Sequence, residues 1–416
     1  LLPLGFFLGV PYAGLLDTGQ AAPQRWALAG ALGVGLAALV GRNMRWAWLA
    51  AGGIVLSVGV FCTVAGTGMP WRGVSFLAFW LTAVGGTLGA VKARRWRLTV
   101  VGAGVTALLW ATMTSHMSPP PARRVSAGVM TALPLFWAEG RSSEALLENA
   151  RDEAFVGAST LDLRPVDRLD AETLAPVKRL LLAQPRLLAP TEMVALDAWV
   201  RAGGRAVILA DPLLLWPSDL PLGYALRPPL TSLLDPLLAH WGLELTPADK
   251  GTRRLLLPGG QALIVAGASQ FSSRTSQCKL LERGLMAVCA IGRGRVRLIA
   301  DADMVDDRLW LARPDSFRTR AALSADTIAL IDGWLLDPAA DPAPVSINRV
   351  RGEASLIAGL RWALLGGSIW AGMGGYWFAR RERMGKAGRE SGMGRNWQGD
   401  IPENRNIDGT SRGRET

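Results

Sequence analysis

The chain has 416 residues, of which 50% are hydrophobic and only 19% are charged. Water-soluble chains usually carry about a quarter charged residues, so this composition excludes an ordinary soluble protein. The net charge of +11 would suggest nucleic-acid binding. However, residues 118–353 hold equal numbers of basic and acidic residues, and the excess lies in short loops between apolar runs and in the tail. That placement indicates membrane topology, and we expect no nucleic-acid partner.

Six apolar runs predict helices that cross a lipid bilayer. A span needs roughly 20 apolar residues, and it must be helical because lipid offers no partner to a free backbone amide. The runs lie at about 1–16, 26–41, 46–66, 74–91, 97–115 and 357–379. The first run lacks a basic start and a small-residue cleavage site, so we interpret it as a span rather than a cleaved signal. We therefore expect an all-α transmembrane region of about six helices.

These runs divide the chain into four parts. Residues 1–117 form a five-span transmembrane region, and residues 118–353 have the composition of a water-facing globular domain. Residues 354–380 form a C-terminal transmembrane helix. Residues 381–416 are basic and poor in large apolar residues, which predicts a disordered cytoplasmic tail.

Basic residues concentrate in alternate loops between the runs. They are Arg42 and Arg45, then Lys92, Arg94, Arg95 and Arg97, and finally Arg380, Arg381, Arg383 and Lys386. Short loops rich in Lys and Arg face the cytoplasm. We therefore expect a multi-pass protein of the inner (plasma) membrane, with both termini cytoplasmic and residues 118–353 periplasmic or extracytoplasmic.

Small residues recur at helical spacing on the last span. Gly367, Ala371 and Gly375 lie four residues apart, and ridges of this kind allow two helices to approach closely. The alternative is that a Gly- and Ala-rich helix produces the pattern by chance.

The clearest folding unit of the water-facing domain runs from Val177 to Pro212. The apolar run 177–183 is typical of a strand that is buried on both faces. Pro190 suits the first turn of a helix, and Gly203 and Gly204 can end it. A second apolar strand then leads to Asp211. Strand–helix–strand at this spacing predicts parallel strands, so we expect a Rossmann-like α/β sheet, mostly parallel, with antiparallel additions.

Two stretches of this domain resemble a known family. They are LLLAQPRLLAPTEMVALDAWVRAGGRAVILADP and GRGRVRLIADADMVDD, and they are similar to the extracytoplasmic domain of ABC-transport auxiliary proteins of the gliding-motility type. The resemblance covers roughly residues 125–340. It implies a glutamine-amidotransferase-like α/β domain anchored by flanking spans, with an ABC permease and a separate ATPase subunit as partners. That family usually has one span before the domain, whereas about five are predicted here.

The usual catalytic motifs are missing from the sequence. There is no phosphate-binding G-x-x-x-x-G-K-[ST] loop, no G-x-S-x-G elbow and no H-E-x-x-H metal motif. A Cys–His pair needs an exposed thiol, but Cys62 lies within a predicted span and Cys289 within an apolar run. Cys278 and Cys289 both lie in the domain that faces an oxidising compartment. They are either joined in a disulfide or two free buried thiols.

Acidic residues follow three predicted strands, and they are the candidate binding residues. Asp211, Asp301 and Asp303 come directly after strands, and Glu139 follows the first strand of the domain. Ligands of open α/β sheets bind beyond the carboxyl ends of the strands, so these residues could bind a cation, a sugar or a basic peptide. The alternative, which we favour, is that each Asp caps the turn that follows it. Their spacing does not match a calcium or magnesium loop, and we expect neither a metal nor a cofactor.

Three functions remain open from the sequence. The first is a non-enzymatic accessory subunit of an ABC-type transport system, whose outward-facing domain binds a substrate or a partner. The second is a hydrolase or amidase that uses the acidic residues at the strand ends. The third is a membrane-anchored scaffold for envelope components, independent of any transporter. The missing motifs make an enzyme the weaker expectation.

Overall fold

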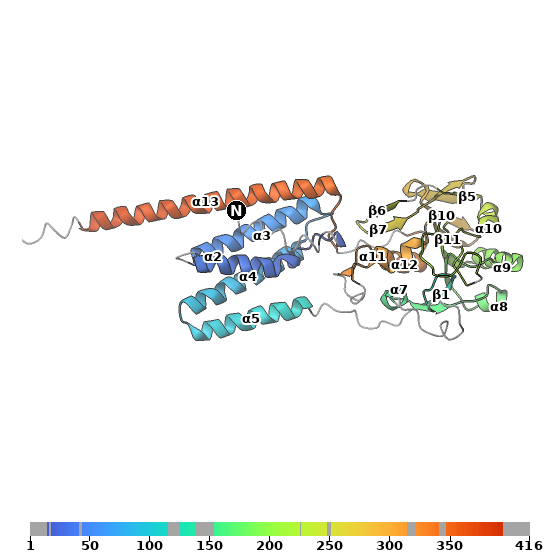
Figure 1. The fold of residues 1–416 in the computed structure, drawn as a ribbon, viewed down its shortest axis with the longest axis horizontal. Coiled ribbons are helices and arrows are strands. Elements are labelled where there is room, and N and C mark those ends of the chain that lie inside the picture. The colour runs from blue at the N-terminus through green and yellow to red at the C-terminus, as the bar shows by residue number, and fades with distance from the viewer. Residues whose placement is uncertain are drawn as a thin grey trace, which may run out of the picture.

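The computed structural model describes residue 15 and residues 18–40, 44–114, 125–137, 154–224, 226–247, 251–313, 322–340 and 347–393. A group of long helices forms one end of the molecule, and a sheet with short helices around it forms the other (Figure 1). The predicted first span lies outside the described residues apart from Leu15, and so does Glu139.

Three helices are long and apolar enough to cross a membrane. They are α3 (Arg45–Ala65), α4 (Trp71–Lys92) and the part of α13 (Glu353–Met393) that runs from Glu353 to Arg381. The predicted runs 26–41 and 97–115 form α2 (Ala27–Val40) and α5 (Trp96–Thr114). A short helical turn, η1 (Pro23–Trp26), precedes α2. Membrane association is thus supported by three helices, and the expectation of six spans stays a prediction.

Helix α13 is longer than the span predicted from the sequence. It continues from residue 380 to Met393, so the beginning of the tail, for which disorder was expected, is helical. Arg, Glu, Met, Lys and Ala in residues 381–393 favour a helix, whereas Gly385, Gly388 and Gly392 oppose it. Extension of a helix that has already formed avoids the cost of nucleation, which favours its continuation into this segment.

Helix α13 packs along α3 through glycines. A Cβ at Gly359 would lie 2.8 Å from Ala65 Cβ, and one at Gly367 would lie 2.7 Å from Ser57 Oγ. Gly374 is similarly close to Leu49. Of the predicted small-residue ridge, only Gly367 therefore packs on α3. Gly375 faces open space and Ala371 is exposed, because the contacts recur about every two turns rather than every four residues.

The domain is built around a seven-stranded sheet in the order β2-β1-β3-β4-β11-β10-β9. The first five strands are parallel to one another, and β10 and β9 are antiparallel additions. The bounds are β1 (Ser126–Thr131), β2 (Asp162–Pro165), β3 (Arg179–Ala183), β4 (Arg205–Leu209), β9 (Cys278–Leu281), β10 (Met286–Ile291) and β11 (Gly294–Ile299). The predicted mostly parallel sheet is confirmed, and its description as Rossmann-like and amidotransferase-like stays a prediction.

Local sequence explains the central strand–helix–strand unit. Strands β3 and β4 are buried at almost every position, as their continuous apolar runs indicate. Helix α9 (Pro190–Arg201) begins at a proline, and the Glu192 carboxylate accepts a hydrogen bond from the Ala189 amide at 2.9 Å. Gly203 ends the helix with a φ of +115°, a conformation that glycine adopts readily.

Shorter elements surround the sheet. The helices are α7 (Ala154–Ala158), α8 (Ala171–Leu174), α10 (Asp235–His240), η2 (Glu282–Gly284), η3 (Asp303–Val305), α11 (Asp307–Trp310) and α12 (Thr327–Leu336). Two antiparallel pairs lie outside the main sheet: β5 (Leu243–Thr246) with β8 (Gln270–Ser273), and β6 (Thr252–Leu256) with β7 (Ala262–Ala266). A disulfide joins Cys278 to Cys289, which face each other across β9 and β10.

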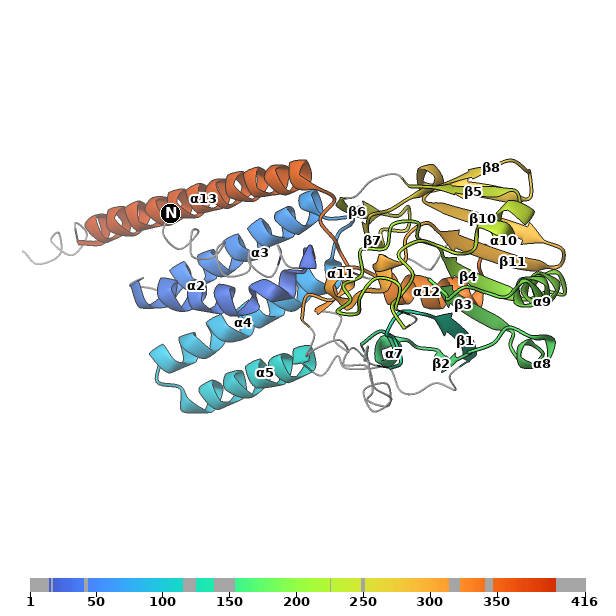
Figure 2. The ribbon, with the colours of Figure 1, turned by 45° about the vertical axis from the view of Figure 1, so that its right-hand side comes forward.

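The long helices and the domain meet at a buried ion pair. Arg349 lies between α12 and α13, and Asp326 directly precedes α12. The Arg349 Nη2 and Nε atoms donate to the two carboxylate oxygens of Asp326 at 2.7 and 2.9 Å. The side chains are 0% and 2% exposed. Figure 2 shows α11 and α12 on that side of the domain which faces the long helices.

Further hydrogen bonds close this junction. Arg349 Nη1 also donates to the carbonyl oxygens of Thr18 and Ser324. Gln20 forms an isolated antiparallel bridge with Arg349, and Gly66 forms one with Val350. The segment that precedes α2, the residue that follows α3 and the segment that precedes α13 therefore lie against one another at the base of the domain.

The glycine contact between α13 and α3 can be tested with two matched substitutions. Gly359→Ala adds a methyl group that overlaps α3, whereas nothing lies within 4 Å of a Cβ at Gly366. We expect Gly359→Ala to lower the free energy of unfolding by about 1–3 kcal/mol relative to Gly366→Ala. Thermal unfolding in detergent measures the difference. Equal stability of the two variants would contradict the packing described here.

The junction ion pair predicts strongly non-additive effects. Arg349→Met leaves Asp326 buried without its cation and is expected to cost about 3–5 kcal/mol. The double variant Arg349→Met/Asp326→Asn should cost less than the sum of the single variants, because the stranded charge is removed with its partner. Arg164 is a control, since its ion pair with Asp162 is largely exposed and its loss should cost less than about 1 kcal/mol. Additive effects at the junction would show that the two side chains do not act as a pair.

Candidate functional site

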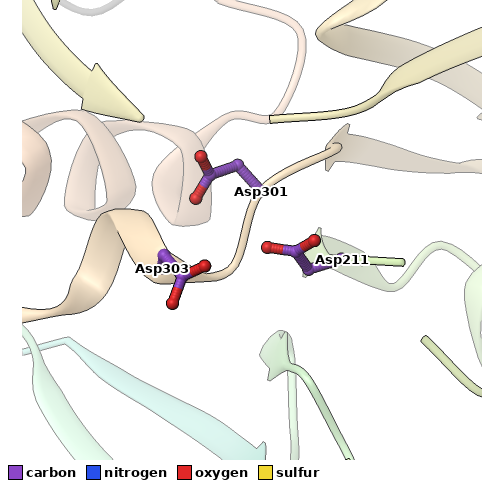
Figure 3. A group of neighbouring side chains, drawn as sticks. All are labelled: Asp211, Asp301 and Asp303. Atoms are coloured by element: carbon purple, nitrogen blue, oxygen red, sulfur yellow. The ribbon is translucent and has the colours of Figure 1, made fainter. Parts of the chain in front are cut away.

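Three aspartates gather at the carboxyl ends of β4 and β11. Asp211 follows β4 by two positions, and Asp301 and Asp303 follow β11 (Figure 3). Each offers a carboxylate oxygen, and these oxygens lie within 4.8 Å of one another. The aspartates are only 0%, 0% and 2% exposed. The structure thus brings together three of the four acidic residues predicted from the sequence.

Parallel pairing of β4 and β11 explains why the aspartates meet. The two strands are neighbours in register, with Leu209 opposite Ile299, so their carboxyl ends meet at the same edge of the sheet. Residues two positions beyond each strand then face one another across a short gap. This meeting follows from strand order, which the sequence alone did not give.

The carboxylates accept hydrogen bonds from backbone amides. Asp301 accepts from the amides of Met304 and Ala266, both at 2.7 Å. Asp211 accepts from those of Leu213 and Ala302. Such bonds satisfy amides that the turns would otherwise leave unpaired. The turn-capping alternative that we favoured from the sequence agrees with this geometry.

Asp303 reaches into a different segment. It accepts a hydrogen bond from the amide of Leu215 at 2.7 Å, in the proline-rich stretch 212–229. A carboxylate that follows β11 therefore fixes a loop that follows β4. Asp301 has a similar long-range role, because Ala266 is the last residue of β7.

Burial raises the pKa values of all three carboxyl groups. It raises the pKa of Asp211 to about 6 and that of Asp303 to about 7. The pKa of Asp301 lies well above its usual range, first because of burial and then because of the charges of Asp211 and Asp303. A hydrogen bond between the side chains of Asp303 and Asp211 lowers the pKa of Asp211. Near neutral pH the cluster therefore keeps protons, as closely spaced carboxyl groups generally do.

Gln184 completes the cluster, and it was not among the candidate residues from the sequence. It follows β3, is fully buried, and has a φ of 43°, which non-glycine residues adopt rarely. Its side-chain Nε2 donates to the carbonyl oxygens of Asp211 and Pro229, and its Oε1 accepts from the amide of Asp211. Gln184 therefore holds both ends of the proline-rich stretch against the strand ends. A polar residue directly after a buried strand was the only signal in the sequence.

The arrangement favours a structural role over chemistry on a substrate. Three carboxylate oxygens at this separation could hold a cation such as Ca²⁺ or Mg²⁺. Their oxygens already accept backbone amides, however, and retained protons compete with a metal. The near-complete burial also leaves a sugar or a peptide little carboxylate surface to contact. The expected lack of a metal stays a prediction.

A thiol nucleophile also has no place in this arrangement. Two of the three cysteines, Cys278 and Cys289, form the disulfide, and the third, Cys62, is buried within α3. None of them is therefore an exposed thiol, which a Cys–His mechanism requires. His240 lies near Arg201 and Asp197 on the surface, and His116 lies outside the described residues.

Comparison with known proteins does not identify a family. No protein-family model matches the chain, and no curated protein matches its sequence. An exo-beta-1,4-mannosidase from Opitutaceae bacterium strain TAV5 is 10% identical with a TM-score of 0.28, and the match covers 50% of this chain and 35% of the mannosidase chain. Cytoplasmic Protein STM1381 from Salmonella typhimurium LT2 is 9% identical with a TM-score of 0.29, and the match covers 43% of this chain and 87% of the Salmonella chain. The beta-galactosidase from Rahnella sp. R3 is 13% identical with a TM-score of 0.28, covering 51% and 33%.

This chain thus spans about a third of the length of the mannosidase and of the galactosidase. TM-scores of this size support no conclusion about the fold or the activity of this chain. The resemblance to transport auxiliary proteins stays an expectation from the sequence.

The raised pKa values predict that the domain loses stability as pH rises from acid through neutral values. Unfolded Asp has a pKa near 3.9, so stability from the protonated carboxyls is complete below about pH 4. It is lost as pH rises through the folded values of about 6 and about 7. In Asp303→Asn the amide oxygen can accept from Leu215 while its NH₂ donates to Asp211, which imitates the protonated form. We expect this variant to lose less stability than the wild type between pH 6 and pH 8, by on the order of 1–3 kcal/mol.

Asp301→Asn is the matched control. Both Asp301 oxygens accept hydrogen bonds from backbone amides. The side-chain NH₂ group of asparagine would replace one of these oxygens and would therefore face a backbone N–H donor. This variant should be destabilised at every pH. Thermal unfolding of the full chain across pH distinguishes the two cases, and equal pH profiles for the wild type and Asp303→Asn would rule out proton sharing at Asp303.

Proposed function

We propose that this chain is a non-enzymatic accessory subunit of an ABC-type membrane transport system. Its apolar helices lie in the inner membrane, both termini are cytoplasmic, and its α/β domain faces outward to bind a substrate or an envelope partner. Support comes from the sequence resemblance to transport auxiliaries and from a domain joined directly to three helices that could cross a membrane.

The buried junction is the observation that carries the proposal. Arg349 and Asp326 are shielded from water and hydrogen-bonded on both sides. Separating them would strand a buried charge, which is costly. The domain is therefore held at one orientation relative to the long helices. A fixed orientation suits a subunit that presents its domain above a permease, whereas a domain that only needs anchoring can be connected to its membrane helix by a flexible linker.

The strand-end aspartates argue against catalysis. Backbone amides occupy their oxygens, and the side chains are almost fully buried. A hydrolase would need at least one reactive group in contact with its substrate. A scaffold that works independently of a transporter remains the rival function, and it differs from our proposal in the proteins that bind the long helices.

The open side of α13 is the proposed surface for the permease. Only 11% of the apolar window of this helix is buried within the chain, because α13 packs mainly on α3. Ile369, Met373 and Tyr376 are largely exposed along it. Helices of another membrane protein can pack on such a surface by van der Waals contact.

Co-purification tests this function. The full chain, tagged and extracted in mild detergent, should recover an ATPase with a phosphate-binding loop and a multi-span permease. An unrelated multi-span protein with the same tag should recover neither. If no ATPase or permease is recovered in several mild detergents, the transport role is wrong and the scaffold role is preferred.

Two wedge variants locate the contact. Gly366 on α13 and Gly104 on α5 both face open space, so a tryptophan at either position leaves the chain's own packing intact. We expect Gly366→Trp to reduce the recovered permease strongly and Gly104→Trp to leave it nearly unchanged. The reverse pattern would show that the permease contacts α5 rather than α13.

A further inference from the structure

Among the residues that the structure describes, the junction carries more positive charge than Asp326 neutralises. Both oxygens of Asp326 accept hydrogen bonds from Arg349, and one of them also accepts from the amide of Ala262. A second guanidinium, that of Arg254 on β6, lies near enough for the charge of Arg349 to lower its pKa, after the larger effect of burial. Asp326 opposes this effect, but its oxygens are already occupied.

The side chain of Arg254 has no hydrogen-bond acceptor among the residues that the structure describes. It forms no ion pair with them either, and it is exposed to solvent. Its guanidinium carries five N–H donors. The donors of Arg254 are therefore available to an anion from outside the chain.

Gly19 allows the guanidinium of Arg254 to lie close to the backbone. Gly19 has a φ of +60°, and a Cβ at this position would overlap the guanidinium of Arg254. The guanidinium thus packs directly on the backbone of the segment that precedes α2. A larger residue at position 19 would displace the guanidinium, so Gly19 is what permits this close approach.

Gly19 and the guanidinium of Arg254 lie at the ends of the long helices that are nearest the domain. The carbonyl oxygen of Gly19 accepts a hydrogen bond from the amide of Val350, and Val350 pairs with Gly66, the residue after α3. When α3 spans a bilayer, its end lies at the boundary between the hydrocarbon core and the headgroups. Arg254 then lies at the level of the lipid phosphates on the domain's side of the membrane.

We propose that Arg254 binds a phosphate group, supplied by the headgroup of an anionic phospholipid packed between the domain and the long helices. Guanidinium matches phosphate oxygens with two parallel hydrogen bonds. The bound anion would offset the repulsion between Arg254 and Arg349. This inference goes beyond the proposed function, since it concerns how the domain is seated on the bilayer whether or not a transporter binds.

Thermal unfolding of the full chain in neutral detergent tests the proposal. The probes are phosphatidylglycerol, phosphatidylcholine and inorganic phosphate, compared at one ionic strength. We expect phosphatidylglycerol to raise Tm more than phosphatidylcholine does. Arg254→Gln should remove at least half of this difference, whereas Lys279→Gln should retain it. Lys279 is the matched control, because it is an exposed single charge on β9, an edge strand of a different sheet.

A second measurement separates ligand binding from a structural role. Without lipid, Arg254→Gln should be at least as stable as the wild type, because it removes a cation that repels Arg349. A lower Tm in plain detergent would show that Arg254 supports the fold itself and would overturn the proposal. An equal phosphatidylglycerol effect in wild type and Arg254→Gln would also overturn it. If inorganic phosphate alone reproduces the effect, and Arg254→Gln abolishes it, phosphate recognition is supported and the lipid source is rejected.

Discussion

The buried pair of Arg349 and Asp326 is the constraint on which the arrangement of this protein depends. A charge that is removed from water must keep its partner, so the two segments that carry these residues cannot move apart independently. Arg349 belongs to the segment that leads into α13, and Asp326 precedes α12. The pair therefore fixes the orientation of the domain relative to the long helices, and hydrogen bonds to Thr18 and Ser324 reinforce it.

A second polar centre fixes the edge of the sheet itself. Asp211, Asp301 and Asp303 accept amides from the turns that follow β4 and β11, and Gln184 holds the proline-rich stretch against them. This edge is where an α/β sheet usually binds its ligand. Here the polar groups are used to organise loops, so a ligand of this domain would contact the loops rather than the carboxylates.

Local sequence predicted the elements that depend on local physics. The unit from Val177 to Pro212 was recognised from an apolar run, a proline at a helix start and a glycine pair at its end, and it corresponds to β3, α9 and β4. The aspartates were identified because each follows a strand. Their convergence was not predictable, since it depends on β11 pairing with β4 across 90 residues of chain.

The contacts that matter most join residues far apart in sequence, and this explains what sequence reasoning missed. No sequence pattern marks Arg349, and its partners Thr18 and Asp326 lie in other segments. No pattern marks the contacts of Gln184 either. Of the predicted ridge on α13, Gly367 contacts α3 and Gly375 does not, because the position of α3, rather than the pattern within α13, decides which glycines are contacted.

A single short strand links the two polar centres. The amide of Ala262, at the start of β7, donates to Asp326, and the amide of Ala266, at its end, donates to Asp301. Strand β7 therefore connects the junction with the long helices to the edge of the sheet. Because a packed strand is stiff along its length, a shift of the loops at that edge must either break one of these two hydrogen bonds or move the junction with it. A domain built in this way is mechanically continuous with its helices, which is a more demanding construction than anchoring alone requires.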